Sequence, residues 1–233
     1  MSEKAEILIE GSYLYFQNDV NYSQENFKVV HMEDSQNLHI YAEILSRIET
    51  GEFLKILVRY EMNQHYVPTF VRTEKSIGNR YAQEVMKFDL QNQTLHYTFQ
   101  NSQGSQEFTK SVNAKHYLTS PAFCTSAIFT LSKKFDTTGR TPIVLVGSSN
   151  DWTYESPPDE KIIYAEYKSR EMTDFQINNN TLAASHLCLY EHDTSFTGGE
   201  APVDVYISKH YAIPYQLISG GQKIVIKNLK KNN

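Results

Sequence analysis

The chain has 233 residues, 40% of them hydrophobic and 12% aromatic, which is enough apolar surface to bury a core. Its 27 acidic and 22 basic side chains give a net charge of −5 and are mixed along the sequence, without the basic stripe that nucleic-acid binding needs. Cys124 and Cys188 are too few for a disulfide framework and cannot form a four-ligand zinc site, and we expect two free thiols because an intracellular setting keeps thiols reduced.

Membrane and export signals are not found in the sequence. No window approaches the roughly 20 apolar residues of a spanning helix, so no transmembrane segment is predicted. The N-terminus carries acids where a secretory signal is positively charged, and its apolar run is only Ile7, Leu8 and Ile9. We therefore expect a cytoplasmic protein, or a periplasmic one if an export signal has been removed.

Alternation of apolar and polar residues predicts β-strands. The longest run is 53–63, and the same period of two occurs at 38–44, 94–99 and 203–207. The connections are short and rich in Asn, Gly, Ser and Asp, so consecutive strands should be neighbours in an antiparallel meander. The predicted fold class is mainly β: a long curved antiparallel sheet, half-barrel or open barrel, of roughly 12–14 strands.

One segment, 121–135, breaks this period and predicts an internal helix. Ser120 is a suitable N-cap, and Pro121 fits the first helical position, where its missing N–H costs nothing. The apolar residues recur at the three-and-four spacing of one buried face: Phe123, Ala127, Ile128, Leu131 and Phe135. A lone helix with such a face implies a sheet that it packs against.

We expect residues 1–233 to form a single β-rich domain, with 148–160 as a surface loop. Two stretches within it, 53–75 and 203–227, resemble each other. Each has an alternating strand, a polar turn, a His-Tyr pair and a proline that opens the return strand. The likeness is either an internal hairpin repeat or a chance similarity.

The order of elements supports a wider comparison. Residues 11–16 open the chain, two hairpins return through Pro68 and Pro214, a turn follows 87–89, and the 123–135 helix interrupts the sheet. This order resembles uncharacterised bacterial domains with a fold akin to the LolA and LolB lipoprotein carriers. In that family an antiparallel sheet curls into an open half-barrel plugged by helical segments. The resemblance implies the same architecture here.

The candidate catalytic residues gather in 184–193. If this segment is a strand, one face carries His186, Cys188, Tyr190 and His192. Cysteine and histidine in reach of each other suit a thiolate nucleophile, or provide two or three ligands for a soft divalent metal. Alternatively, Leu187 and Leu189 pack on the core, and the opposite face shows polar side chains to solvent without any chemistry. The pattern therefore assigns no catalytic, metal or cofactor-binding residue.

Three functions stay open. The first is binding of a hydrophobic or lipid-like small molecule in the concave face of the sheet. The second is an enzyme of cyclase, isomerase or hydrolase type that acts in the same cavity. The third is a structural or protein-interaction scaffold that pairs through a free sheet edge, and a homo-oligomer fits any of the three. No cofactor is predicted, because the sequence has no Walker loop, dinucleotide fingerprint, nucleophile elbow or HExxH motif.

Overall fold

A computed structural model describes residues 4–112, 116–131, 139–177, 180–191, 202–208 and 211–232. Its strands and its two short 3₁₀ helices are β1 Ala5–Gln17, β2 Val20–Met32, β3 Asn37–Arg47, β4 Phe53–Met62, β5 Pro68–Ile77, β6 Arg80–Asp89, β7 Thr94–Asn101, β8 Gly104–Ser111, β9 His116–Leu118, η1 Phe123–Thr125, η2 Ile128–Thr130, β10 Thr141–Gly147, β11 Asp159–Ile177, β12 Asn180–Tyr190, β13 Val203–Ile207, β14 Pro214–Ser219 and β15 Gln222–Lys231.

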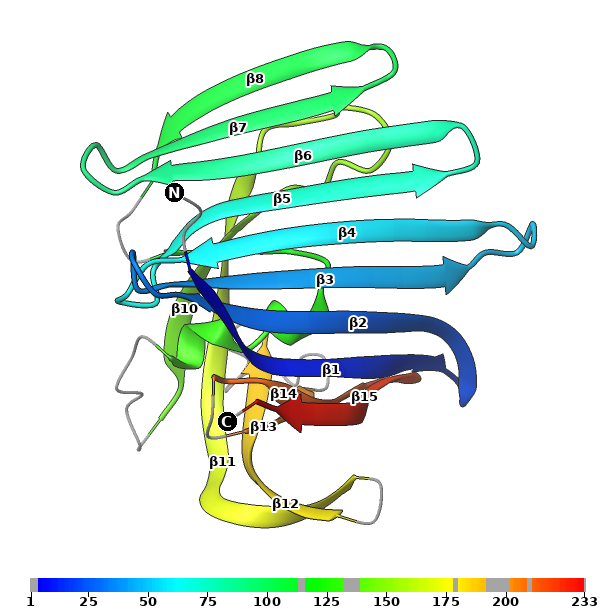
Figure 1. Cartoon of the computed structure of the whole chain (residues 1–233), viewed down its shortest axis with the longest axis vertical. Helices are drawn as coiled ribbons and strands as arrows, with labels where there is room; N and C mark the ends of the chain where they lie inside the picture. The colour runs from blue at the N-terminus through cyan, green and yellow to red at the C-terminus, as the bar shows by residue number, and fades with distance from the viewer. Residues whose placement is uncertain are drawn as a thin grey trace.

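These strands belong to one sheet, in the order β8-β7-β6-β5-β4-β3-β2-β1-β15-β14-β13-β12-β11-β10-β9. Two antiparallel meanders, β1 to β8 and β10 to β15, meet where β1 pairs with β15, so the first and last strands lie side by side in the middle of the sheet (Figure 1). Strand β9 pairs with β10 in parallel. The predicted mainly-β, open antiparallel sheet is confirmed, with 15 strands among the described residues in place of the expected roughly 12–14.

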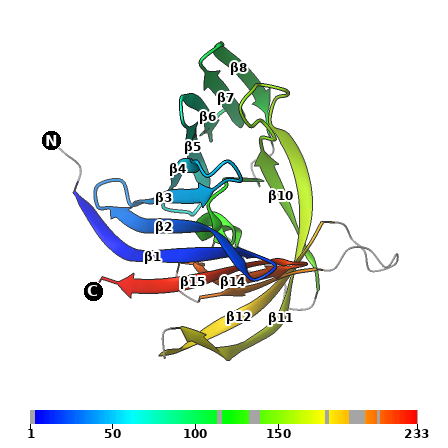
Figure 2. The same cartoon turned by 90° about the vertical axis from the view of Figure 1, so that its right-hand side faces the viewer.

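The sheet rolls so that its edge strand β9 lies inside, against β4 and β6. The Tyr60 hydroxyl of β4 donates to the carbonyl of Leu118 in β9 at 2.9 Å. Phe88 of β6 meets His116 of β9 edge to face, with ring centroids 4.3 Å apart. Figure 2 shows the green segment that follows β9 lying between the two halves of the sheet. The opposite edge, β8, carries mostly polar side chains, which discourage pairing with another chain.

The strand prediction follows from the alternation. Val58 and Tyr60 of β4 are buried, whereas Leu57 and Arg59, which alternate with them, are exposed. Return strands β5 and β14 begin at Pro68 and Pro214, as the hairpin pattern predicts. The expected loop runs from 148 to 158 and packs over β5 to β7. Within the described part of the chain, no helix is long and apolar enough to cross a membrane.

The predicted helix is present as a short helical segment, but its form differs from the expectation. Two separate 3₁₀ turns, η1 and η2, replace a continuous α-helix, and 132–138 lie outside the described residues. The Thr125 and Thr130 hydroxyls donate at 2.8 Å to the carbonyls three residues earlier, those of Ala122 and Ala127. These bonds stabilise the tighter 3₁₀ turns in place of a continuous α-helix.

Most of the expected apolar face is nevertheless buried. Phe123, Ala127 and Ile128 are at most 4% exposed, and Leu131 packs partly buried against the two apolar clusters found among the described residues, whereas Phe135 lies outside those residues. The Ser120 hydroxyl accepts the N–H of Ala122 at 3.2 Å, but the N-cap of η1 is Ala122, so the predicted cap Ser120 and the predicted first helical residue Pro121 both lie before the helix. The segment therefore fills the inside of the rolled sheet.

A buried carboxylate attaches this segment to the sheet. Glu25 of β2 is 0% exposed, and its oxygens accept the backbone N–H groups of Phe123 at 2.8 Å and Cys124 at 3.0 Å. The Tyr15 hydroxyl donates to the same carboxylate. Burial raises the pKa of Glu25, although the donors Tyr15, Cys124 and Phe123 act in the opposite direction.

Stability should depend on pH through Glu25. Because its pKa is raised above the ordinary 4.5, the folded protein holds this proton more tightly than the unfolded chain. The resulting stabilisation is complete below the ordinary pKa of 4.5, and it is lost as pH rises through the raised pKa of the folded protein. We expect the free energy of unfolding to fall over this window, and to fall less in Glu25→Gln. Urea unfolding at a series of pH values measures both slopes, and equal slopes would contradict the assignment.

Candidate functional site

The predicted site lies on β12, which pairs with β11 on one side and β13 on the other. Leu187 points into the second apolar cluster and is 0% exposed, with Leu189 packed partly buried beside it. His186, Cys188 and Tyr190 therefore face the other way, as the alternation predicts. Cys188 is only 2% exposed, so neighbouring side chains on this face shield most of it from solvent.

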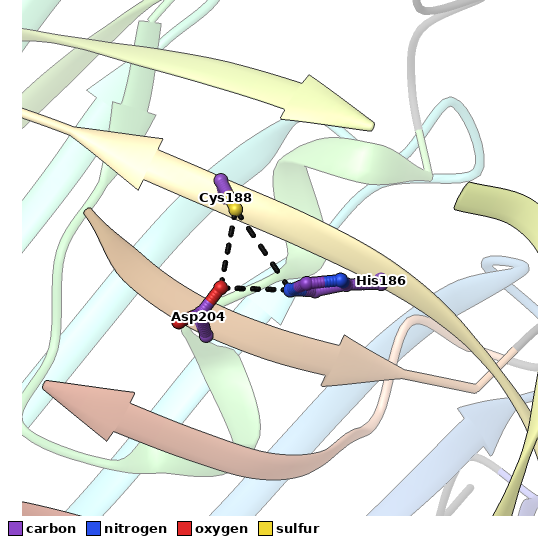
Figure 3. Close-up of side chains that lie close together, drawn as sticks. All are labelled: His186, Cys188 and Asp204. Carbon is purple, nitrogen blue, oxygen red and sulfur yellow. Dashed lines mark hydrogen bonds and ion pairs between the residues drawn. The ribbon is translucent and has the colours of Figure 1, made fainter. Parts of the chain in front are cut away.

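The strand pairing brings an aspartate to two of these residues. Asp204 of β13 is the cross-strand partner of Cys188. The Cys188 thiol donates to Asp204 Oδ1 at 3.2 Å, and His186 Nε2 lies 2.7 Å from the same oxygen and 3.8 Å from the sulfur (Figure 3). We call His186, Cys188 and Asp204 the His-Cys-Asp cluster. The His186 ring stacks on Tyr206, with centroids 4.7 Å apart and planes 8° apart, which fixes its orientation.

The cluster does not have the arrangement of a nucleophilic triad. In a triad the imidazole uses one nitrogen for the nucleophile and the other for the carboxylate. Here Nε2 of His186 faces both partners, and the Cys188 thiol donates directly to the carboxylate. Burial, followed by the hydrogen bond to Asp204, raises the pKa of Cys188 to about 12. A free thiolate nucleophile at neutral pH is therefore disfavoured.

Tyr190 belongs to a neighbouring group of charges. Its hydroxyl donates to Glu166 of β11 at 3.0 Å, and the Arg140 guanidinium lies 3.8 Å from its ring centroid. Lys168 forms an ion pair with Glu166 at 3.0 Å. The hydrogen bond from Lys168, reinforced by those from Tyr190 and Arg140, lowers the pKa of the Glu166 carboxyl. The carboxylate stays ionised and holds the two cations in place.

Of the predicted site residues, the structure brings His186 and Cys188 together and places Tyr190 in the adjacent group, while His192 lies outside the described residues. Sequence reasoning missed Asp204 and Glu166. The only sequence signal for Asp204 was its position on the polar side of the alternating run 203–207. The strand register that sets it opposite Cys188 is not readable from sequence.

Comparisons with known proteins identify the fold. No protein-family model matches the chain, and no curated protein does. A crystal structure of a beta-barrel-like protein of the domain of unknown function DUF1849 from Brucella abortus matches 97% of this chain and 98% of its own, with a TM-score of 0.62 and 6% identity. A DUF1089 family protein from Pseudomonas aeruginosa matches 83% of this chain and 88% of its own, with a TM-score of 0.52 and 10% identity. The chain thus has the beta-barrel-like fold seen in these bacterial proteins, whereas the resemblance to LolA and LolB stays a prediction.

Proposed function

We propose that the protein binds a lipid-like small molecule, with an apolar body and a polar head, in a groove on the outward face of β1 to β5. This outer groove encloses about 570 Å³, and its outward side chains include Glu10, Lys28, Tyr41, Glu43, Leu57, Arg59, Arg72 and Glu74. The volume carries the proposal, because pockets for small organic ligands measure roughly 300–1,000 Å³.

The floor of the groove suits an apolar chain. Leu57 is 37% exposed, although it lies on the polar side of β4. The Lys28 ammonium lies 5.1 Å above the Tyr41 ring, so its methylene stem covers apolar surface. The Arg59 guanidinium lies 5.5 Å from the ring of Phe70, a residue outside the lining, so the Arg59 stem also lies along apolar surface. Aromatic and methylene groups therefore face the space that the ligand body would fill.

The rim of the groove suits a polar or zwitterionic head. Two of its carboxylates are paired: Glu74 with Arg72 at 2.7 Å, and Glu43 with Lys55, a neighbour outside the lining, at 2.6 Å. The side chains of Arg72 and Lys55 are 42% and 45% exposed, and exposed ion pairs contribute at most about 1 kcal/mol. These pairs can open at little cost and bind opposite charges on a head group.

The inward face, which the sequence predicts as the binding surface, offers less room. Residues 116–131 fill most of it, and its pocket between β5, β6 and this segment measures about 240 Å³. That pocket contains Lys75 and Glu84, whose charged atoms lie 3.6 Å apart. A small, charged pocket fits an apolar chain poorly, so we assign the ligand to the outer groove.

Two measurements test this proposal. Native mass spectrometry of protein purified without added ligand should show a lipid-like adduct. Calorimetric titration with a zwitterionic lysophospholipid below its micellar concentration should then show binding that Leu57→Glu weakens about tenfold or more, because a carboxylate in the floor must be desolvated. Ile162→Glu on β11, which replaces a 50% exposed isoleucine outside the groove, is the matched control. Equal affinities of the two variants would rule out the groove.

A further inference from the structure

We propose that the His-Cys-Asp cluster is a binding site for a divalent zinc-type metal ion, independent of ligand binding in the outer groove. The three side chains offer one imidazole nitrogen, one sulfur and one carboxylate oxygen, all within 4.8 Å of one another. Figure 3 shows the three atoms pointing toward a common centre from two paired strands.

The separations come within about 0.6 Å of those in a tetrahedral site. With bonds of about 2.0–2.3 Å, the ligand atoms of tetrahedral zinc lie about 3.3–3.6 Å apart. The observed separations are 3.8 Å between nitrogen and sulfur, 3.2 Å between sulfur and oxygen, and 2.7 Å between nitrogen and oxygen. Binding replaces the hydrogen bonds among the three groups, and the largest movement separates His186 Nε2 from Asp204 Oδ1 by about 0.6 Å.

The ligand types select the metal. Thiolate and imidazole favour zinc and other late transition metals over magnesium or calcium, which prefer oxygen ligands. When the ion binds, the Cys188 thiol loses its proton to solvent and a metal–sulfur bond forms, with no change in oxidation state. The thiolate and the Asp204 carboxylate together then balance the charge of a divalent ion. These three ligands, the set that the described residues supply, leave one tetrahedral position for water or a small anion.

The surroundings hold the ligands in place. Cys188 is 2% exposed on a strand paired on both sides, and Tyr206 fixes the His186 ring by stacking. Glu166, opposite Cys188 on β11, is bound by Lys168 and Arg140, so these two cations are held by a carboxylate outside the cluster. His186 and Asp204 keep 23% and 38% exposure of their side chains, which gives an ion a path from solvent.

The test uses tag-free, metal-stripped full-length protein. Calorimetric titration with zinc should show one ion per chain, and cobalt should give the thiolate-to-metal charge-transfer band together with the visible bands of tetrahedral cobalt. Cys188→Ser should abolish the charge-transfer band, and Asp204→Asn and His186→Gln should each weaken zinc binding at least tenfold. His96→Gln, which alters an exposed histidine on β7, is the matched control and should change zinc affinity less than twofold.

The outcomes separate a metal site from a cluster held by hydrogen bonds alone. Absence of zinc binding to the wild-type protein, or a cobalt–thiolate band that survives Cys188→Ser, would overturn the proposal. Circular dichroism checks the fold of each variant. If Cys188→Ser fails to fold, Asp204→Asn and His186→Gln still test the proposal. Zinc affinities of these two variants equal to that of the His96→Gln control would overturn the proposal.

Discussion

The Glu25→Ala variant is expected to lose about 3–5 kcal/mol of its free energy of unfolding. The substitution removes the acceptor for two consecutive backbone N–H groups, those of Phe123 and Cys124, and for the Tyr15 hydroxyl. All three donors then lie unpaired inside the rolled sheet, where water does not replace the lost hydrogen bonds. Urea unfolding followed by circular dichroism measures the change.

Glu33→Ala is the control for this prediction. Glu33 pairs with Lys4 at 2.9 Å, but the two side chains are 38% and 78% exposed, so its loss should cost less than about 1 kcal/mol. Tyr15→Phe should fall between the two variants, since it removes one donor and leaves the carboxylate bound to the backbone. A Glu25→Ala protein as stable as Glu33→Ala would show that the carboxylate does not anchor the 3₁₀ segment.

The Leu187→Ala variant is expected to lose about 2–5 kcal/mol of stability. Leu187 is 0% exposed and packs in the second apolar cluster, which includes Phe129, Ile143 and Val205. Truncation leaves a cavity there, because strands paired on both sides cannot move inward to fill it. The effect should appear as a lower urea midpoint with an unchanged slope.

Leu90→Ala provides the comparison for Leu187→Ala. Leu90 is 42% exposed in the turn after β6, and its truncation should change stability by about 0.5 kcal/mol or less. Similar midpoints for the two variants would mean that the leucine face of β12 does not face the core. In that case His186 and Cys188 would be the buried side of the strand, and the metal site would lose its access to solvent.

Local patterns were sufficient to predict the strands. Alternation in 53–63 correctly predicted a strand, of which Val58 and Tyr60 form part of the buried face, and the prolines at 68 and 214 correctly marked the start of return strands. Such predictions succeed because side-chain direction in a strand depends only on position parity. The same parity correctly put His186 and Cys188 on one face.

Long-range pairing was the part that could not be predicted. In the sequence, Glu25 looks like an ordinary polar residue of an alternating strand. Only the rolling of the sheet brings the backbone N–H groups of Phe123 and Cys124 to its carboxylate. Asp204 reaches Cys188 through the register of β12 with β13, which depends on the connection between the strands. The spacing in 121–135 correctly indicated the burial of Phe123, Ala127 and Ile128, but could not show that Thr125 and Thr130 favour 3₁₀ turns.

The pairing of β1 with β15 also constrains how the protein can form during synthesis. The eight strands of the first meander leave the ribosome before any strand of the second, and β1 offers its unpaired edge to solvent until β15 has been made. The centre of the finished sheet is thus the last part to close, across almost the whole length of the chain. A nascent chain that stalls late in translation presents an open strand of thirteen residues, from Ala5 to Gln17, to any neighbouring chain.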